Sequence, residues 1–346
     1  MTGKYKIAVV GEAWGAEEEA QRVPFVGASG YHLTQMLDEA GIHRADCFLT
    51  NCFNLRPPGG NDIANLCLDK ANGVGSLGPV TLGKYLDPKY LPELDRLRTE
   101  ITEHRPNIVI ALGNTAAWAI LGSSGISRIR GTVTYGGRSG YEQQKVIPTF
   151  HPAAILRDWS LRPVTVLDLA KAKRESEFSE IRRPERTVYI EPSLQDMEWY
   201  YENFIINARS LSFDIETSGD QITCIGFGPD KTTALVVPFR DTRQVSGDHV
   251  GSYWPTKEAE VLAWRFVRRV LSLPMPKYGQ NTIYDINFLW TRYGITVVNY
   301  DDDTMLMHHA LHPESLKGLG FLGSVYSNES SWKLLNRRTP TEKREK

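Results

Sequence analysis

Short apolar runs, each closed by a glycine, recur along the first half of the chain and constrain its fold most strongly. Residues 7–10 run into Gly11, and residues 108–112 run into Gly113. Such runs are typical of buried strands. Between them, apolar residues recur at helical spacing over 33–40. Strands that alternate with helices predict an α/β domain with a mainly parallel sheet.

A second pattern begins near residue 187. Residues 211–216 alternate apolar and polar side chains, as half-buried strands do. A chain of 346 residues also exceeds what one hydrophobic core usually serves. We therefore expect two α/β domains with a charged linker and tail, at residues 1–175, 176–186 (linker), 187–330 and 331–346 (tail).

The composition of the chain restricts the partners and sites that it can have. Its 40 Lys and Arg residues nearly balance 41 Asp and Glu residues, so contact with nucleic acid would need local basic patches. The four cysteines form no CxxC pair, which argues against a disulfide framework or a zinc site. No apolar run reaches membrane-spanning length, and the start lacks a signal peptide. We expect no membrane partner and a cytoplasmic location.

Two acidic residues stand out in the second half. Asp214 and Glu216 lie two residues apart on a predicted strand, so both carboxylates share one face. Two adjacent carboxylates repel unless a cation lies between them, and Mg²⁺ or Mn²⁺ prefers such oxygen ligands. The ordinary alternative is a solvated strand face. Asp285, on a likely helix, adds a third carboxylate, whereas residues 301–303 look like a helix cap with solvated acids.

The second half resembles the DEDD-type 3′–5′ exonucleases of the proofreading domains of family A DNA polymerases. The resemblance rests on FDIET at 213–217, NTIYD at 281–285, DTMLMHHAL at 303–311 and KGLG at 317–320. It implies a ribonuclease H-like α/β fold, with Asp214, Glu216 and Asp285 as metal ligands. Glu216 would also orient the attacking water. The third family motif is missing, because no Asp follows Asp303.

The first half resembles family 4 uracil-DNA glycosylases over roughly residues 5–175. The matching motifs are GEAWG at 11–15, PFVG at 24–27, Asn51 before RPP at 56–58, ALG at 111–113, RG at 130–131 and PTFHP at 148–152. The resemblance implies a three-layer α/β fold. It also implies chemistry in which a base is extruded from DNA, read at its edge and released as an anion.

Each matching residue acquires an expected role from this resemblance. Phe25 would stack on the extruded base, Asn51 would read its edge, His151 would hydrogen-bond the departing base, and Glu12 would position water. Phe25 as plain core and His151 as a strand-end cap are the ordinary alternatives. The remaining expected contacts are Gly11 and Gly15 at the base, and Arg56, Ile155, Leu156 and Arg157 on DNA, with Ile155 and Leu156 as wedges.

The chain also departs from that family. Trp14 stands where the family has proline, and Ala153 stands where it has serine. Many members hold an iron–sulfur cluster on four cysteines, but here Leu55 and Glu93 fall near two of those positions. We therefore expect no iron–sulfur cluster.

The two resemblances in this order are similar to the N-terminal part of certain phage family A DNA polymerases. The leading hypothesis is a phage replication and repair protein that acts in the host cytoplasm. It would be accessory to, or split from, a family A DNA polymerase, and a separate polymerase chain would complete the exonuclease site. One alternative is a stand-alone uracil-DNA glycosylase. Another is a non-catalytic DNA-binding module.

Overall fold

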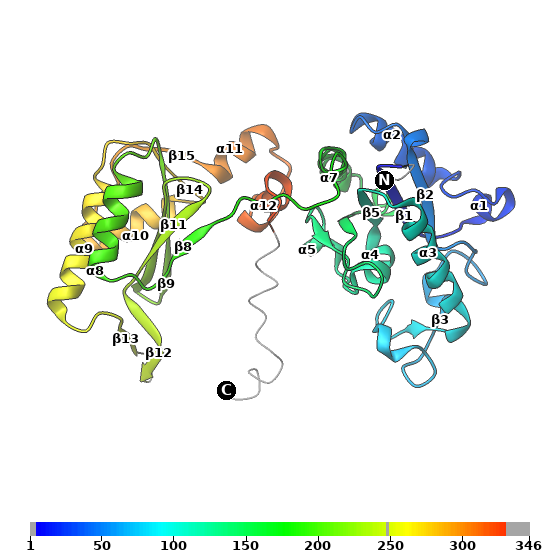
Figure 1. The fold of residues 1–346 in the computed structure, drawn as a ribbon, viewed down its shortest axis with the longest axis horizontal. Helices are drawn as coiled ribbons and strands as arrows, with labels where there is room; N and C mark the ends of the chain where they lie inside the picture. Colours follow the sequence, from blue (N-terminus) through cyan, green and yellow to red (C-terminus); the bar gives the residue numbers. More distant parts are fainter. Residues whose placement is uncertain (1–4, 247–248, 330–346) are drawn as a thin grey trace. The chain divides into compact units, whose positions relative to one another are not determined.

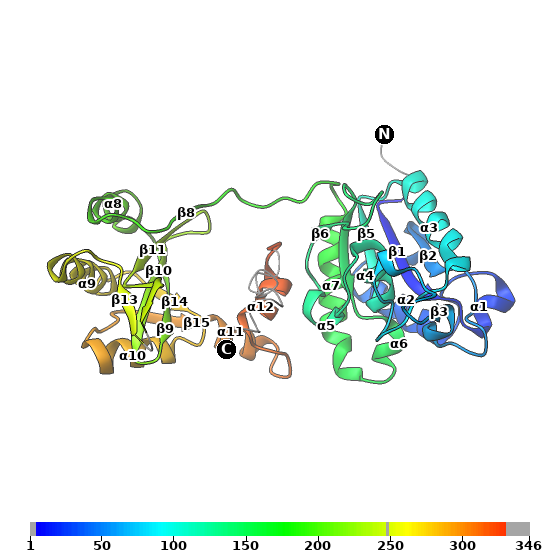
Figure 2. The ribbon, with the colours of Figure 1, turned by 90° about the horizontal axis from the view of Figure 1, so that it is seen from below.

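The computed structural model describes residues 5–246 and 249–329, which form two compact units (Figures 1 and 2). The first unit runs to Arg183 and takes in a segment from Gly320 onward, and the second is Pro184–Leu319. Residues 320–329 were expected in the second domain, but they pack with the first unit instead. The predicted tail at 331–346 lies outside the described residues.

The first unit is built on a five-stranded sheet in the order β2-β1-β5-β7-β6. Strands β1, β2, β5 and β7 are parallel, and β6 is antiparallel to β7. This confirms the predicted α/β fold. The strands are β1 (Ile7–Ala13), β2 (Cys47–Phe53), β5 (Ile108–Leu112), β6 (Thr134–Tyr135) and β7 (Lys145–Thr149).

Helices cover both faces of this sheet and make three layers. Alternate residues of β1 point to opposite faces, so Val9 joins one apolar cluster and Val10 the other. Helices α2 and α7 contribute to the Val9 cluster, and α3 and α4 to the Val10 cluster. Their bounds are α2 (Ala28–Glu39), α3 (Leu91–His104), α4 (Gly113–Leu121) and α7 (Arg162–Glu175).

Shorter elements complete the first unit. The glycine-rich insert at 59–91 carries the small antiparallel pair β3 (Cys67–Leu68) and β4 (Tyr85–Leu86). The indole nitrogen of Trp118 on α4 holds this insert by donating to Leu77 O at 3.0 Å. Three short helices flank the strand ends: α1 (Ala16–Gln21), α5 (Ile126–Ile129) and α6 (Pro152–Ile155).

The second unit has a six-stranded sheet in the order β15-β14-β9-β10-β11-β8. Strands β9, β10 and β11 form an antiparallel meander, and β14 and β15 continue the sheet parallel to β9. This is the strand order of the expected ribonuclease H-like fold. The strands are β8 (Thr187–Tyr189), β9 (Leu211–Ser218), β10 (Gln221–Gly228), β11 (Thr233–Pro238), β14 (Lys277–Gly279) and β15 (Tyr300–Asp303).

Helices and a hairpin surround this second sheet. The helices are α8 (Leu194–Tyr200), α9 (Lys257–Leu271), α10 (Ile283–Tyr293) and α11 (Thr304–Leu311), and the hairpin is β12 (Arg240–Ser246) with β13 (His249–Ser252). On β9 the side chains alternate between buried and exposed up to Glu216, as the sequence predicted. No helix in the described part of the chain is long and apolar enough to span a bilayer.

The segment that returns to the first unit includes most of α12 (Leu319–Tyr326), and buried charges hold it. Lys171 Nζ donates to Gly131 O at 2.7 Å and to Ser324 O at 2.8 Å. Arg130, which pairs with buried Asp168, donates to Ser324 Oγ at 2.9 Å. A buried cation needs such partners, because carbonyl oxygens replace the water it loses. These contacts explain why residues 320–329 belong with the first unit.

Candidate active site

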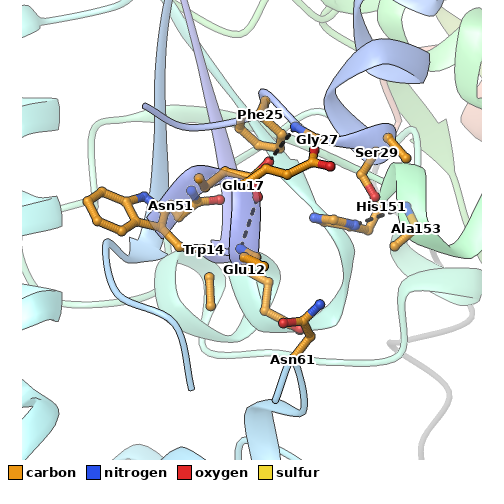
Figure 3. Close-up of a pocket in the computed structure, with 15 residues that line it drawn as sticks. Glu12, Trp14, Glu17, Phe25, Gly27, Ser29, Asn51, Asn61, His151 and Ala153 are labelled. Atoms are coloured by element: carbon orange, nitrogen blue, oxygen red, sulfur yellow. Dashed lines mark hydrogen bonds between the residues drawn. The ribbon is translucent and has the colours of Figure 1, made fainter. Parts of the chain in front are cut away.

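A pocket of about 330 Å³ opens at the carboxyl end of the parallel strands of the first unit. Open α/β sheets usually place ligand sites at this edge. Glu12 comes from the end of β1, Asn51 from β2 and His151 from the residues after β7. Phe25 and Gly15 also line the pocket, so the structure gathers five of the predicted site residues (Figure 3).

Glu12 is the acidic group of this pocket. Burial raises the pKa of Glu12, while a hydrogen bond from Thr115 Oγ1 to its carboxylate opposes that rise. Asp62 raises the pKa further, and Arg157 lowers it. A half-buried carboxylate with a raised pKa holds its proton more tightly than an exposed one, which suits a group that exchanges protons with water.

His151 stays neutral because of its surroundings. Burial of the imidazole lowers the pKa of His151 to about 4, and the positive charge of Arg157 adds to the effect. Nδ1 accepts a hydrogen bond from the Ala153 amide at 3.1 Å, so the ring proton of the neutral form is on Nε2. His151 thus caps the start of α6 through Nδ1, and its Nε2–H remains a donor in the residue that lines the pocket (Figure 3).

Phe25 is held in a strained backbone conformation. Its φ is +57°, and Arg44 Nη2 donates to its carbonyl at 2.8 Å. The ring packs in the apolar core and lies 6.4 Å from the His151 ring between centroids. Phe25 is therefore both a core residue and one wall of the pocket. Such strain is kept where neighbouring contacts over-determine the backbone, and it often marks functional sites.

Gly11 is required where it stands. A Cβ on Gly11 would lie 2.3 Å from Asn51 Oδ1 and 2.5 Å from Phe25 Cζ. The missing side chain lets both residues approach β1. Asn51 is buried, and its side-chain amide makes no hydrogen bond with another residue in the described part of the chain. Its donor and acceptor are therefore available to a ligand.

Glu18, which sequence reasoning missed, joins the two loops that frame the pocket. Its carboxylate accepts from the backbone amides of Gly15 at 3.1 Å, Val26 at 3.0 Å and Gly27 at 2.9 Å. The loop after β1 and the loop before α2 are thereby fixed to one side chain. An acid three residues after a helix-starting residue is a capping pattern, so the spacing from Gly15 to Glu18 carried a signal.

Trp14 forms part of the pocket wall, where the resembling family has proline. Its backbone amide donates to Leu55 O at 3.1 Å, and its indole Nε1 is buried without a hydrogen-bond partner among the described residues. In Figure 3 Trp14 lies beside Asn51, across the pocket from His151 and Ala153. The indole lines the pocket on the Asn51 side without filling it.

The residues expected to contact DNA divide into two groups. Ile155 is only 1% exposed and lies in the apolar core, so the prediction that it wedges between bases is wrong. Leu156 is 48% exposed, so its side chain is accessible to DNA. Arg56 is partly engaged, since it pairs with Glu19 at 3.6 Å and donates to Asn61 Oδ1 at 3.0 Å. A DNA contact by Leu156, Arg56 or Arg157 stays a prediction.

The thiols do not fit a four-cysteine cluster. Cys47 and Cys52 are both on β2, yet they belong to apolar clusters on opposite faces of the sheet. Near Leu55, the Glu93 carboxylate accepts the Asn54 amide at 2.7 Å and pairs with Arg96 at 3.1 Å. An ionic network therefore occupies the place where the resembling family would put cluster ligands.

The second unit places two of its predicted carboxylates on β9 and links the third to the same strand. Asp214 and Glu216 occupy alternate, exposed positions of β9, and buried Asp285 Oδ1 accepts the Ile215 amide at 2.9 Å. Burial raises the pKa of Asp285 to about 6, and the charge of Asp214 adds to it. Burial, together with the Glu216 charge, also raises the pKa of Asp214.

Carboxylates are suitable ligands for Mg²⁺ or Mn²⁺, but among the described residues they are not arranged as a metal site. Over 5–246 and 249–329, no three His, Cys, Asp or Glu side chains are gathered closely enough to hold a metal ion. We therefore derive no reaction step through a metal. Asp303 acts as the expected helix cap, because it accepts the Met305 amide at 2.8 Å at the start of α11.

Comparison with known proteins gives results for both halves. Residues 2–181 match the family model of the uracil DNA glycosylase superfamily. The type-4 uracil-DNA glycosylase of Archaeoglobus fulgidus is 34% identical over 173 residues, which cover 49% of this chain and 75% of that protein. The type-4 enzyme of Thermotoga maritima is 33% identical over 174 residues, with coverage of 49% and 76%.

Among the solved structures that resemble the chain are nucleases. The crystal structure of the EXD2 exonuclease domain soaked in Mg and dGMP has 14% identity and a TM-score of 0.27, and the match covers 45% of this chain and 79% of that one. An apo form of a nuclease has the same identity and TM-score, with coverage of 46% and 72%. Because these TM-scores are low, the fold of the second unit is assigned from its strand order alone.

Proposed function

Because the chain belongs to the uracil DNA glycosylase superfamily through residues 2–181, we propose that its first unit removes uracil from DNA. The observation that carries this proposal is the neutral His151 with its proton on Nε2, in one pocket with Glu12, Phe25 and Asn51. The superfamily and type-4 relatives support the substrate class.

In this proposal an extruded uracil lies against Phe25, and Asn51 pairs with its O4 and N3–H. The bond from the sugar C1′ to the base N1 breaks, and its electron pair leaves with the base. His151 Nε2–H donates to the O2 of the base, where negative charge develops, so the donor stabilises the transition state. Glu12 orients the water that adds at C1′ and can take up its proton.

Excision of uracil from DNA tests the proposal directly. The full chain is incubated with single- and double-stranded oligonucleotides that contain uracil, and alkali then cleaves any abasic product. We expect product with the wild type and a loss of about 10²- to 10³-fold in His151→Ala, typical of removing one such donor. Leu82→Ala, at an exposed site away from the pocket, is the control. No product under conditions where a type-4 enzyme works would overturn the proposal.

We also propose that the second unit binds Mg²⁺ or Mn²⁺ through Asp214, Glu216 and Asp285 and trims DNA from the 3′ end. The placement of Asp214 and Glu216 on one face of β9, with the Asp285 carboxylate bound to the Ile215 amide between them, supports this, because carboxylate oxygens are the ligands that these cations prefer. The test is metal-dependent loss of 3′ nucleotides that disappears in Asp214→Ala. DNA binding without any such loss would favour a non-catalytic DNA-binding module.

The wider role we propose is that of an accessory protein to a DNA polymerase carried on a separate chain, in the cytoplasm of a phage-infected bacterium. The support is the order of a glycosylase-superfamily unit before a ribonuclease H-like unit. Co-purification of a polymerase with the tagged full chain tests this role. A chain that is always recovered alone from infected cells would contradict it.

A further inference from the structure

Three aromatic rings form a contiguous surface next to the pocket, which we call the aromatic platform (Tyr31, His32 and Trp159). The ring centroids of Tyr31 and His32 are 5.6 Å apart, and those of His32 and Trp159 are 5.7 Å apart. Tyr31 is 63% exposed and Trp159 is 58% exposed. Single exposed aromatic residues are ordinary, but here two exposed rings are joined through the half-buried His32, and such contiguous patches are typical of binding surfaces.

The platform continues from the rim of the pocket. Ser29 and Ala153 line the pocket, and Figure 3 shows them with His151 on one side of it. Tyr31 follows Ser29 by two residues on α2, and Trp159 follows Ala153 by six residues, just beyond α6. Helix α6, which carries Ala153, packs against both α2 and the turn at Trp159–Leu161, so the segments that carry the two exposed rings adjoin this side of the pocket.

Charge around the pocket is uneven. Helix α1, which forms another part of the rim, has three successive acids at 17–19. The platform side has Arg157, whose charge acts on His151 and Glu12. Arg162 lies 5.4 Å from the Trp159 ring centroid, but it pairs with Glu39 of α2 at 2.7 Å, so its charge is already balanced. A phosphate backbone is repelled by the acidic helix α1 and attracted by Arg157.

We propose that the aromatic platform stacks a base of the same DNA strand, next to the nucleotide that enters the pocket. This proposal rests on the proposed function in taking DNA as the substrate. The strand would leave the pocket over α2 and Trp159, with its phosphates near Arg157, and avoid α1. Aromatic rings accept any base in this way, because every base has a π face.

Binding to an uncleavable DNA tests the platform. The probe is a fluorescent single-stranded oligonucleotide with a tetrahydrofuran abasic analogue in place of the target nucleotide, bound to the full chain. Loss of one stacked base typically weakens binding by about tenfold, so we expect Kd to rise by that factor in Trp159→Ala and further in Trp159→Ala/Tyr31→Ala. Trp159→Phe should stay near the wild type because it keeps a stacking ring.

The control is Trp199→Ala, which removes a 46% exposed tryptophan from α8 of the second unit. Its Kd should match the wild type. Single-turnover excision at saturating enzyme should also be unchanged in Trp159→Ala, because the platform contacts a neighbouring base rather than the reacting one. A rise in Kd without a change in this rate constant separates a binding surface from damage to the pocket.

The outcomes distinguish this inference from the proposed function. A wild type that binds the probe but never excises uracil would overturn the glycosylase proposal. In that case a higher Kd in Trp159→Ala would still support the platform. Equal Kd values for the wild type and Trp159→Ala/Tyr31→Ala would overturn the platform, even if excision is efficient. Failure of the wild type to bind the probe would overturn it as well.

Discussion

The hydroxyl of Thr115 donates a hydrogen bond to the carboxylate of Glu12, although 103 positions separate the two residues in the chain. Thr115 lies in the first turn of α4, directly after β5, and Glu12 lies near the end of β1. The parallel pairing of β1 with β5 brings the two together. The bond favours the charged form of Glu12, against the burial that raises its pKa.

Thr115→Val should shift the pH dependence of uracil excision. Without the hydrogen bond the pKa of Glu12 rises further, so a smaller fraction of Glu12 is ionised at acidic pH. We expect the acidic limb of the kcat/KM profile to move to higher pH, with about a tenfold loss on that limb, typical of one hydrogen bond to a charged group. Thr115→Ser keeps the hydroxyl and should keep the wild-type profile.

Glu12→Gln should stabilise the protein at neutral pH. The pKa of Glu12 is higher in the folded chain than its ordinary value of 4.5, so folding is disfavoured wherever the unfolded carboxyl is ionised. The cost is present above that ordinary value and disappears below it. The variant should therefore melt at a higher temperature than the wild type at pH 7, and the difference should shrink toward pH 4. An equal difference at both pH values would indicate a packing effect instead.

The outline of both folds follows from local patterns. Residues 211–216 alternate in polarity, and the structure finds β9 with its side chains alternating between buried and exposed positions. The return of Gly320 and the following residues to the first unit could not be predicted in this way. That packing depends on hydrogen bonds from Lys171 to the backbone carbonyls of Gly131 and Ser324. Every residue has a backbone carbonyl, so the sequence does not indicate which ones a buried lysine will bind.

Site residues could be predicted from the sequence where a polar residue of suitable type follows a predicted strand. They could not be predicted where contacts between distant parts of the chain determine the position of the side chain. Glu12, Asn51 and His151 all lie at or after the ends of strands, and the structure gathers them. Thr115 was missed because its bond to Glu12 spans elements distant in sequence. The wedge assignment of Ile155 failed because the orientation of the short helix α6 was unknown, and its side chain turns into the core.

Arg130→Met should destabilise the first unit strongly. Arg130 and Asp168 form a buried ion pair, and Thr149 Oγ1 donates to Asp168 at 2.6 Å. Without Arg130 the buried carboxylate loses its main partner, which costs about 3–5 kcal/mol of unfolding free energy for such pairs. Urea unfolding measures the change.

Two further variants make the Arg130 result specific. Arg182→Met removes an exposed ion pair with Glu180 and should cost at most about 1 kcal/mol. Arg130→Met/Asp168→Leu removes both buried charges and should recover much of the loss, because no unpaired carboxylate remains. A double variant no more stable than Arg130→Met would show that the arginine acts through packing, for example on Phe321, rather than through charge.

Gly11→Ala should impair excision without unfolding the chain. The new methyl group would lie 2.3 Å from Asn51 Oδ1 and 2.5 Å from Phe25 Cζ, so one of these side chains must shift. A displacement of about 1 Å at a base-binding group typically costs about 10²-fold, and we expect a loss of that order in kcat/KM for uracil-containing DNA. Gly75→Ala is the matched control, since no atom lies within 4 Å of its added Cβ. Wild-type kcat/KM in a folded Gly11→Ala protein would mean that Asn51 and Phe25 do not need their present positions to hold the base.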